Sequence, residues 1–177
     1  MKVLVPIDGE ELLDVTVPAV RRLLQAAPGA ELLFLRVLDP RAVHGLAQQD
    51  AEMGRLAIAG SSGPAILPPP PRIVESHGEA MARIHAEAEA ALWDLALGEF
   101  PDAIPSVAVV WSRHPAARIV EAADEHDVDV IVMATHGRGG LAHVIAGSVT
   151  EEVIRRSGRP VLVVGPAFGE KEALAAC

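Results

Sequence analysis

Apolar and polar residues follow one another along the chain in blocks that predict five strands separated by helices. The runs rich in Val, Ile and Leu are mostly continuous rather than alternating, as in parallel strands covered on both faces. They span Val3–Ile7, Glu31–Val37, Val107–Trp111, Val128–Ala134 and Pro160–Val164. Helical spacing between them predicts helices over about Thr16–Ala26 and Glu79–Leu97, one from Pro115 and one after Gly147. This order predicts a doubly wound α/β sheet with right-handed crossovers.

Residues 40–78 interrupt the alternation of strands and helices. They include Gly60-Ser-Ser-Gly-Pro64 and the run Pro68–Pro71, a composition that favours extended polyproline structure over a packed element. We interpret this stretch as a long variable surface insertion, with a short helix around Ala47–Ala57. A docking site for a proline-recognising partner is the alternative.

Length, composition and charge narrow the class of protein. A chain of 177 residues fits one domain with a sizeable core, built from aliphatic side chains because only 3% of the residues are aromatic. Few aromatics argue against stacking platforms for single-stranded nucleic acid, and a net charge of −9 argues against a phosphate-binding surface for DNA. No apolar stretch reaches the ~18 residues of a membrane helix, and the first residues do not resemble a signal peptide. We therefore expect a cytoplasmic protein that binds neither nucleic acid nor membranes.

The residues needed for several kinds of catalytic or metal site are missing. The single cysteine, Cys177, permits neither an internal disulfide nor a cysteine zinc cage, and the seven histidines include no HExxH pattern. Lysine occurs only as Lys2 and Lys171, which excludes a P-loop, and there is no Gly-x-Ser-x-Gly motif. With no catalytic base or metal site identified, we predict no catalytic residue and at most slow hydrolysis of a bound ligand.

Candidate chemistry lies after the strands, because ligands of such sheets bind at the carboxyl ends of strands where the strand order reverses. Gly137, after the fourth strand, is followed nine residues later by Gly147 and Ser148 at the start of a helix. Glycines let backbone N–H groups approach a ligand, and a helix N-terminus offers N–H donors and partial positive charge to a phosphate. Between Arg138 and Pro160, four arginines against two glutamates add local positive charge. The pattern predicts a phosphate site at this loop.

Each of these residues also has a plainer interpretation. Ser148 and Glu151 fit a capping box, which would explain the serine without a ligand. His136 fits an ordinary loop histidine as well as a catalytic base, and Asp8 fits a cap of the turn at Gly9. Gly137-x-Gly139-x-x-Ala142 also matches the dinucleotide fingerprint, but it follows the fourth strand and lacks the acidic residue expected further on.

The motifs at the two ends of the chain resemble the universal stress protein family. The segments that carry the resemblance are Val130–Leu141, Gly147–Glu151 and Arg159–Val164, and the opening Val3–Gly9 is similar to the family's first strand. The resemblance implies a single doubly wound five-stranded parallel sheet in the order 3-2-1-4-5, with helices on both faces. We expect this domain to cover residues 1–166, followed by a tail at 167–177.

The resemblance also implies a nucleotide site, built on the motif Gly-x2-Gly-x9-Gly-Ser/Thr, with Ala134 in place of the first glycine. Asp8 and Val37 would hold the adenine and ribose. The phosphates would lie at Gly137, Gly147, Ser148, Val149 and Thr150, and we assign Pro6, Ala134, His136 and Arg138 to the same site. The expected ligand is ATP, or else ADP or AMP, with or without Mg²⁺.

The family's mode of assembly implies a homodimer formed through the last strand, with Val161 and Val163 in the interface. We therefore expect a stress-response protein that acts as a nucleotide-binding regulator or sensor. The alternative is an interaction module of the same fold that binds no nucleotide and acts through its dimer surface.

Overall fold

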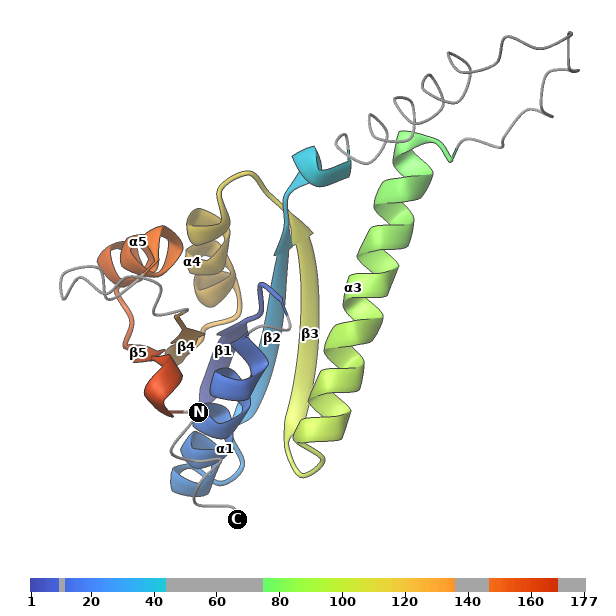
Figure 1. The fold of residues 1–177 in the computed structure, drawn as a ribbon. Helices are drawn as coiled ribbons and strands as arrows, with labels where there is room; N and C mark the ends of the chain where they lie inside the picture. Colours follow the sequence, from blue (N-terminus) through green and yellow to red (C-terminus); the bar gives the residue numbers. More distant parts are fainter. Residues whose placement is uncertain (10–11, 44–74, 136–146, 169–177) are drawn as a thin grey trace, which may run out of the picture.

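The chain folds into a parallel sheet of five strands with helices on both of its faces (Figure 1). The computed structural model describes residues 1–9, 12–43, 75–135 and 147–168. The strand order β3-β2-β1-β4-β5 confirms the predicted fold. In chain order the elements are β1 (Lys2–Pro6), α1 (Leu13–Ala26), β2 (Glu31–Leu38), α3 (His77–Glu99), β3 (Ile104–Trp111), α4 (Pro115–Glu125), β4 (Val130–Ala134), α5 (Ser148–Arg156) and β5 (Val161–Val164).

Every strand and helix predicted within the described residues is present, and the ends differ by a few residues. The strand predicted from Val107 begins earlier, at Ile104. Pro105 pairs with Leu32 of β2, even though proline has no N–H to donate. An outer strand tolerates proline, which the search for continuous apolar runs did not allow for. The helix predicted from Glu79 begins at His77, after a capping box in which Ser76 Oγ accepts from the Glu79 amide at 3.2 Å. The predicted Ala47–Ala57 helix and the proline run lie outside the described residues.

The two layers of helices cover two separate parts of the core. Alternate residues of a strand face opposite sides, so Val3 and Val5 of β1 pack with α1 and α3, whereas Leu4 packs with α4 and α5. Phe34 of β2 and Phe100, just after α3, meet with ring centroids 5.6 Å apart in the first of these layers. Among the described residues, no helix is long and apolar enough to cross a membrane.

The strands differ in length at the carboxyl edge of the sheet. Pairing between β1 and β2 ends at Pro6 and Leu35, but β2 and β3 stay paired as far as Leu38 and Trp111. The two longer strands therefore extend three residues further, about 10 Å at ~3.3 Å per residue. This difference leaves a step above the end of β1, with β2 and β3 as its wall.

Candidate functional site

A pocket of about 550 Å³ lies at this carboxyl edge, where the strand order reverses between β1 and β4. β1 and β4 pair at only two positions, Val3 with Val130 and Leu4 with Ile131, while β4 continues beside β5 to Ala134. Beyond Leu4 the two central strands are no longer hydrogen-bonded to each other, which opens a crevice between their ends. This is where a doubly wound sheet is expected to bind its ligand.

Eight of the predicted site residues line this one pocket. They come from the ends of three strands and the first turn of a helix: Pro6, Asp8, Val37, Ala134, Gly147, Ser148, Val149 and Thr150. His136, Gly137 and Arg138 lie outside the described residues. The structure thus brings together residues that are up to 144 positions apart in the sequence, from Pro6 to Thr150.

Val37 contributes its backbone to the pocket. Leu35 O accepts a hydrogen bond from Ile7 N at 2.8 Å, and Leu38 O accepts one from Ser112 N at 2.9 Å, so alternate residues of β2 face β1 and β3. Val37 therefore turns its N–H and carbonyl towards β1, which has already ended, and no backbone partner is found for them within the described part of the chain. A donor and an acceptor side by side can bind the edge of a nucleobase.

The start of α5 forms the opposite side of the pocket. Gly147 is the N-cap, with φ −62° and ψ 160°, and no described atom outside its chain neighbours lies within 4 Å of where a Cβ would be. Those dihedrals suit any residue, so the backbone itself does not require glycine here. The N–H groups of the first helical turn have no partner within the helix, and they carry the positive end of the helix dipole.

The capping-box interpretation of Ser148 is wrong. Ser148 is the first helical residue rather than the N-cap, because Gly147 takes the cap position, and among the described residues no side-chain cap of α5 is formed. The Ser148 hydroxyl is therefore not used to close the helix, and it lines the pocket. Capping therefore does not explain the serine at this position.

Alanine at position 134 fits the backbone without strain. Ala134 is the last residue of β4, and among the described non-glycine residues only Asp127 has a positive φ, of 50°. The first position of the glycine motif therefore needs no left-handed conformation in this chain. What Ala134 changes is one methyl group in the lining of the pocket.

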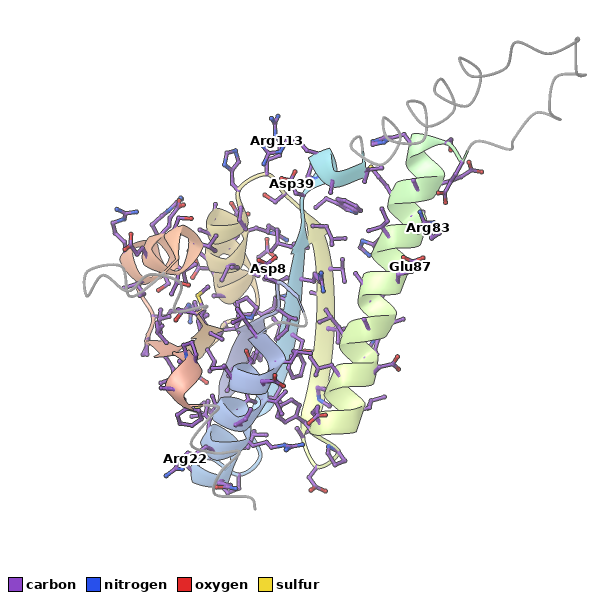
Figure 2. All side chains as sticks on the ribbon, viewed as in Figure 1. Asp8, Arg22, Asp39, Arg83, Glu87 and Arg113 are labelled. Carbon is purple, nitrogen blue, oxygen red and sulfur yellow. The ribbon has the colours of Figure 1, made fainter. Side chains whose placement is uncertain are left out.

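A charged group that the sequence reasoning did not assign to the site lies at the far end of the pocket. Arg41 Nε lies 3.0 Å from both carboxylate oxygens of Asp39, and Arg41 Nη2 lies 2.6 Å from Asp39 Oδ2. These hydrogen bonds, with one from the Arg41 amide, lower the pKa of Asp39 to about 2, and the charge of Arg113 acts in the same direction. Figure 2 shows Asp39 and Arg113 beyond the ends of β2 and β3, with Asp8 lower in the view.

Four further polar lining residues were missed for different reasons. Ser112 and Arg113 directly follow β3, so the rule already applied to the other strands would have found them. Thr135 directly follows β4, so the same rule applies to it, whereas Thr16 is buried on α1 and its approach to the pocket depends on packing that no motif encodes.

Comparison with known proteins gives the same family along nearly the whole chain. The sequence model of the universal stress protein family matches residues 1–165. The universal stress protein MJ0577 of Methanocaldococcus jannaschii is 28% identical over 165 residues, which cover 92% of this chain and 93% of that protein. The solved structure of MJ0577 superposes with a TM-score of 0.53 at 25% identity, covering 93% of this chain and 94% of the other.

Another solved structure shares the fold at lower identity. UspA from Lactobacillus plantarum has a TM-score of 0.60 at 18% identity and covers 93% of this chain and 97% of its own. At this identity the likeness extends to the fold alone.

Proposed function

Because this chain belongs to the universal stress protein family, we propose that it is a stress-response protein that binds ATP, or else ADP or AMP, in the pocket between β1 and β4. It acts as a homodimeric regulator or sensor in the cytoplasm, and neither nucleic acid nor membranes are among its partners. The observation that carries the nucleotide proposal is the uncapped start of α5, where Gly147 and Ser148 open onto a pocket that has Val37 on its other side.

The order of the strands suggests how a nucleotide lies in the pocket. The phosphates lie at the N–H groups of α5, beside β4, and the base lies at the backbone of Val37 on β2. From β4 across β1 to β2 is two strand spacings, about 10 Å, which suits the length of a nucleoside. The ribose then lies in the middle, over the crevice that Asp8 and Ala134 line.

The same chemistry supports binding without rapid turnover. Phosphoryl transfer needs a metal clamp, cations on the γ-phosphate and an oriented water. The described pocket residues include no lysine or histidine, and one of their two carboxylates, Asp39, is held by Arg41. No group of three or more His, Cys, Asp or Glu among the described residues could hold a metal ion, so Mg²⁺ would arrive with the phosphates. The signal is then whether a nucleotide is bound, rather than the release of a reaction product, as in a sensor.

Calorimetry on a matched pair of glycine variants tests the assignment. Gly147 and Gly78 both lie at the start of a helix, and neither would place a Cβ within 4 Å of a described atom, but only Gly147 lines the pocket. We expect Gly147→Val to fold and to lose ATP binding, because the side chain fills the space where phosphate meets backbone, and Gly78→Val to bind normally. Unchanged ATP affinity in a folded Gly147→Val protein would refute the site.

The second candidate is an interaction module of the same fold that binds no nucleotide. Ala134 at the position of the family's first motif glycine favours this second candidate, because its methyl group takes up space in the pocket that a ligand would need. Mass spectrometry of nucleotide released from the purified, denatured protein separates the two candidates. A bound adenine nucleotide supports the first; an empty protein that also fails to bind added ATP, ADP or AMP supports the second.

A further inference from the structure

All three threonines of the chain line the pocket. They are Thr16 on α1, Thr135 just after β4 and Thr150 in the first turn of α5. Each is more than nine-tenths buried, with exposed fractions of 4%, 6% and 5%. Buried hydroxyl groups normally have hydrogen-bond partners, so three of them around one cavity call for an explanation.

None of these hydroxyls has a hydrogen-bond partner within the described part of the chain. Among the described residues, however, no side-chain nitrogen or oxygen that is fully shut off from solvent lacks a partner. The three hydroxyl oxygens must therefore reach the open space of the pocket. They are polar groups that the fold buries but leaves for something in the pocket to satisfy.

Thr135 and Thr150 belong to the side of the pocket where we place the phosphates. Met133 of β4 packs on the face covered by α4 and α5, and Ala134 packs on the face covered by α1 and α3. The next residue, Thr135, therefore faces α4 and α5 again by the alternation of a strand. Thr150 is itself in the first turn of α5.

Thr16 has a different position, on the far side of the sheet. It is on α1, which contacts β4 and whose residues Val15 and Val17 pack in the same core layer as Ile7. Ile7 follows β1 and Ala134 ends β4, so these two residues stand on either side of the crevice. A group that enters the crevice between the two strands meets the α1 side of the pocket, where the lining residues are Leu12 and Thr16.

We propose that the Thr16 hydroxyl hydrogen-bonds a ribose hydroxyl of the bound nucleotide, so that the site selects ribonucleotides over deoxyribonucleotides. The proposal rests on the nucleotide function proposed above, in which the sugar lies over the crevice. A threonine hydroxyl both donates and accepts, as a sugar hydroxyl does, and the carboxylate of Asp8 lines the same pocket as an acceptor. Together they offer acceptors for both hydroxyl hydrogens of a diol and one donor for its oxygens.

The first test needs no variant. Calorimetry of the native protein with AMP, 2′-deoxy-AMP and 3′-deoxy-AMP should show at least one deoxy analogue binding about three- to tenfold more weakly than AMP, the effect of one neutral hydrogen bond. If all three ligands bind with equal affinity, the proposal fails while the nucleotide function stands. If none of them binds, and ATP does not either, both fail.

The second test assigns the discrimination to Thr16. Thr16→Val keeps the shape of the side chain and removes its hydroxyl. It should weaken the affinity for AMP by the same factor and leave the affinity for the disfavoured deoxy analogue unchanged, so that the preference for AMP is abolished. Thr16→Ser should retain the preference. Ser106→Ala removes a hydroxyl from β3, where Ser106 Oγ bonds Leu32 O outside the pocket lining, and should change no affinity. A folded Thr16→Val protein with the full native preference would overturn the proposal.

Discussion

At the scale of single residues, the pocket contains charges that neutralise one another before any ligand arrives. Asp39 accepts hydrogen bonds from the backbone and the guanidinium of Arg41 on both carboxylate oxygens. Its acceptor sites are therefore largely occupied, and the donors that line the same pocket belong to Arg41 and to Arg113. The far end of the pocket consequently offers N–H groups rather than a free carboxylate.

The pKa of Asp39 provides a direct check on this arrangement. Hydrogen bonds from Arg41 lower it from 3.8 to about 2, so the pair forms fully above pH 3.8 and is lost as the pH falls towards 2. In Arg41→Gln the guanidinium hydrogen bonds and charge are lost, while the hydrogen bond from the backbone amide of residue 41 and the charge of Arg113 remain, so the pKa should rise from about 2 part of the way towards 3.8. Carbon-13 NMR of the Asp39 carboxyl should show little titration down to pH 3 in the native protein and clear titration in the variant. A native Asp39 that titrates near pH 3.8 would contradict the ion pair.

At the scale of helices and strands, residue patterns were enough to find each element but not each end. Continuous apolar runs located all five strands because buried parallel strands have no polar face. The same criterion missed Ile104–Ser106, since an outer strand carries exposed and proline residues without losing its pairing with β2. The extra length of β2 and β3, which forms one wall of the pocket, was therefore not foreseen.

Two Ser-x-x-Glu sequences show why helix starts are hard to assign from sequence alone. Ser76 and Glu79 form a capping box at α3, while Ser148 and Glu151 do not, because Gly147 already takes the N-cap position of α5. Both sequences satisfy the same motif, and the difference is one residue of helix length. That residue decides whether the serine closes a helix, as Ser76 does, or lines the pocket, as Ser148 does.

Replacing each serine by alanine should separate these two roles. Ser76→Ala removes a cap hydrogen bond and should lower the free energy of unfolding by about 1 kcal/mol. Ser148→Ala removes no cap and should change the free energy of unfolding by less than about 0.5 kcal/mol, but it should weaken ATP binding. Urea denaturation and calorimetry on the two proteins measure both quantities. A large loss of stability in Ser148→Ala would restore its capping role.

At the scale of the whole molecule, the two outer strands differ in what they expose. β3 contains Pro105, and a proline, which has no N–H to donate, makes an edge strand less able to pair with another chain. It also carries the exposed Ile104 at one end. β5 is four residues of Val and Leu with no charge or proline to protect it. Its Leu162 is 41% exposed and Val161 and Val163 are half-buried, so β5 is the edge suited to a second copy of the chain.

A homodimer through β5 is the last prediction. The native protein should scatter light as a particle of twice the 18.6 kDa chain mass at micromolar concentration. Val163→Lys should shift it to the monomer, because in an isologous interface the substitution places two like charges in the same apolar contact. Ile104→Lys makes the same kind of change on the opposite edge, at a residue that is 66% exposed, and should leave the dimer intact. If the unmodified protein is monomeric under these conditions, or if Val163→Lys remains a dimer while Ile104→Lys does not, the β5 interface is wrong.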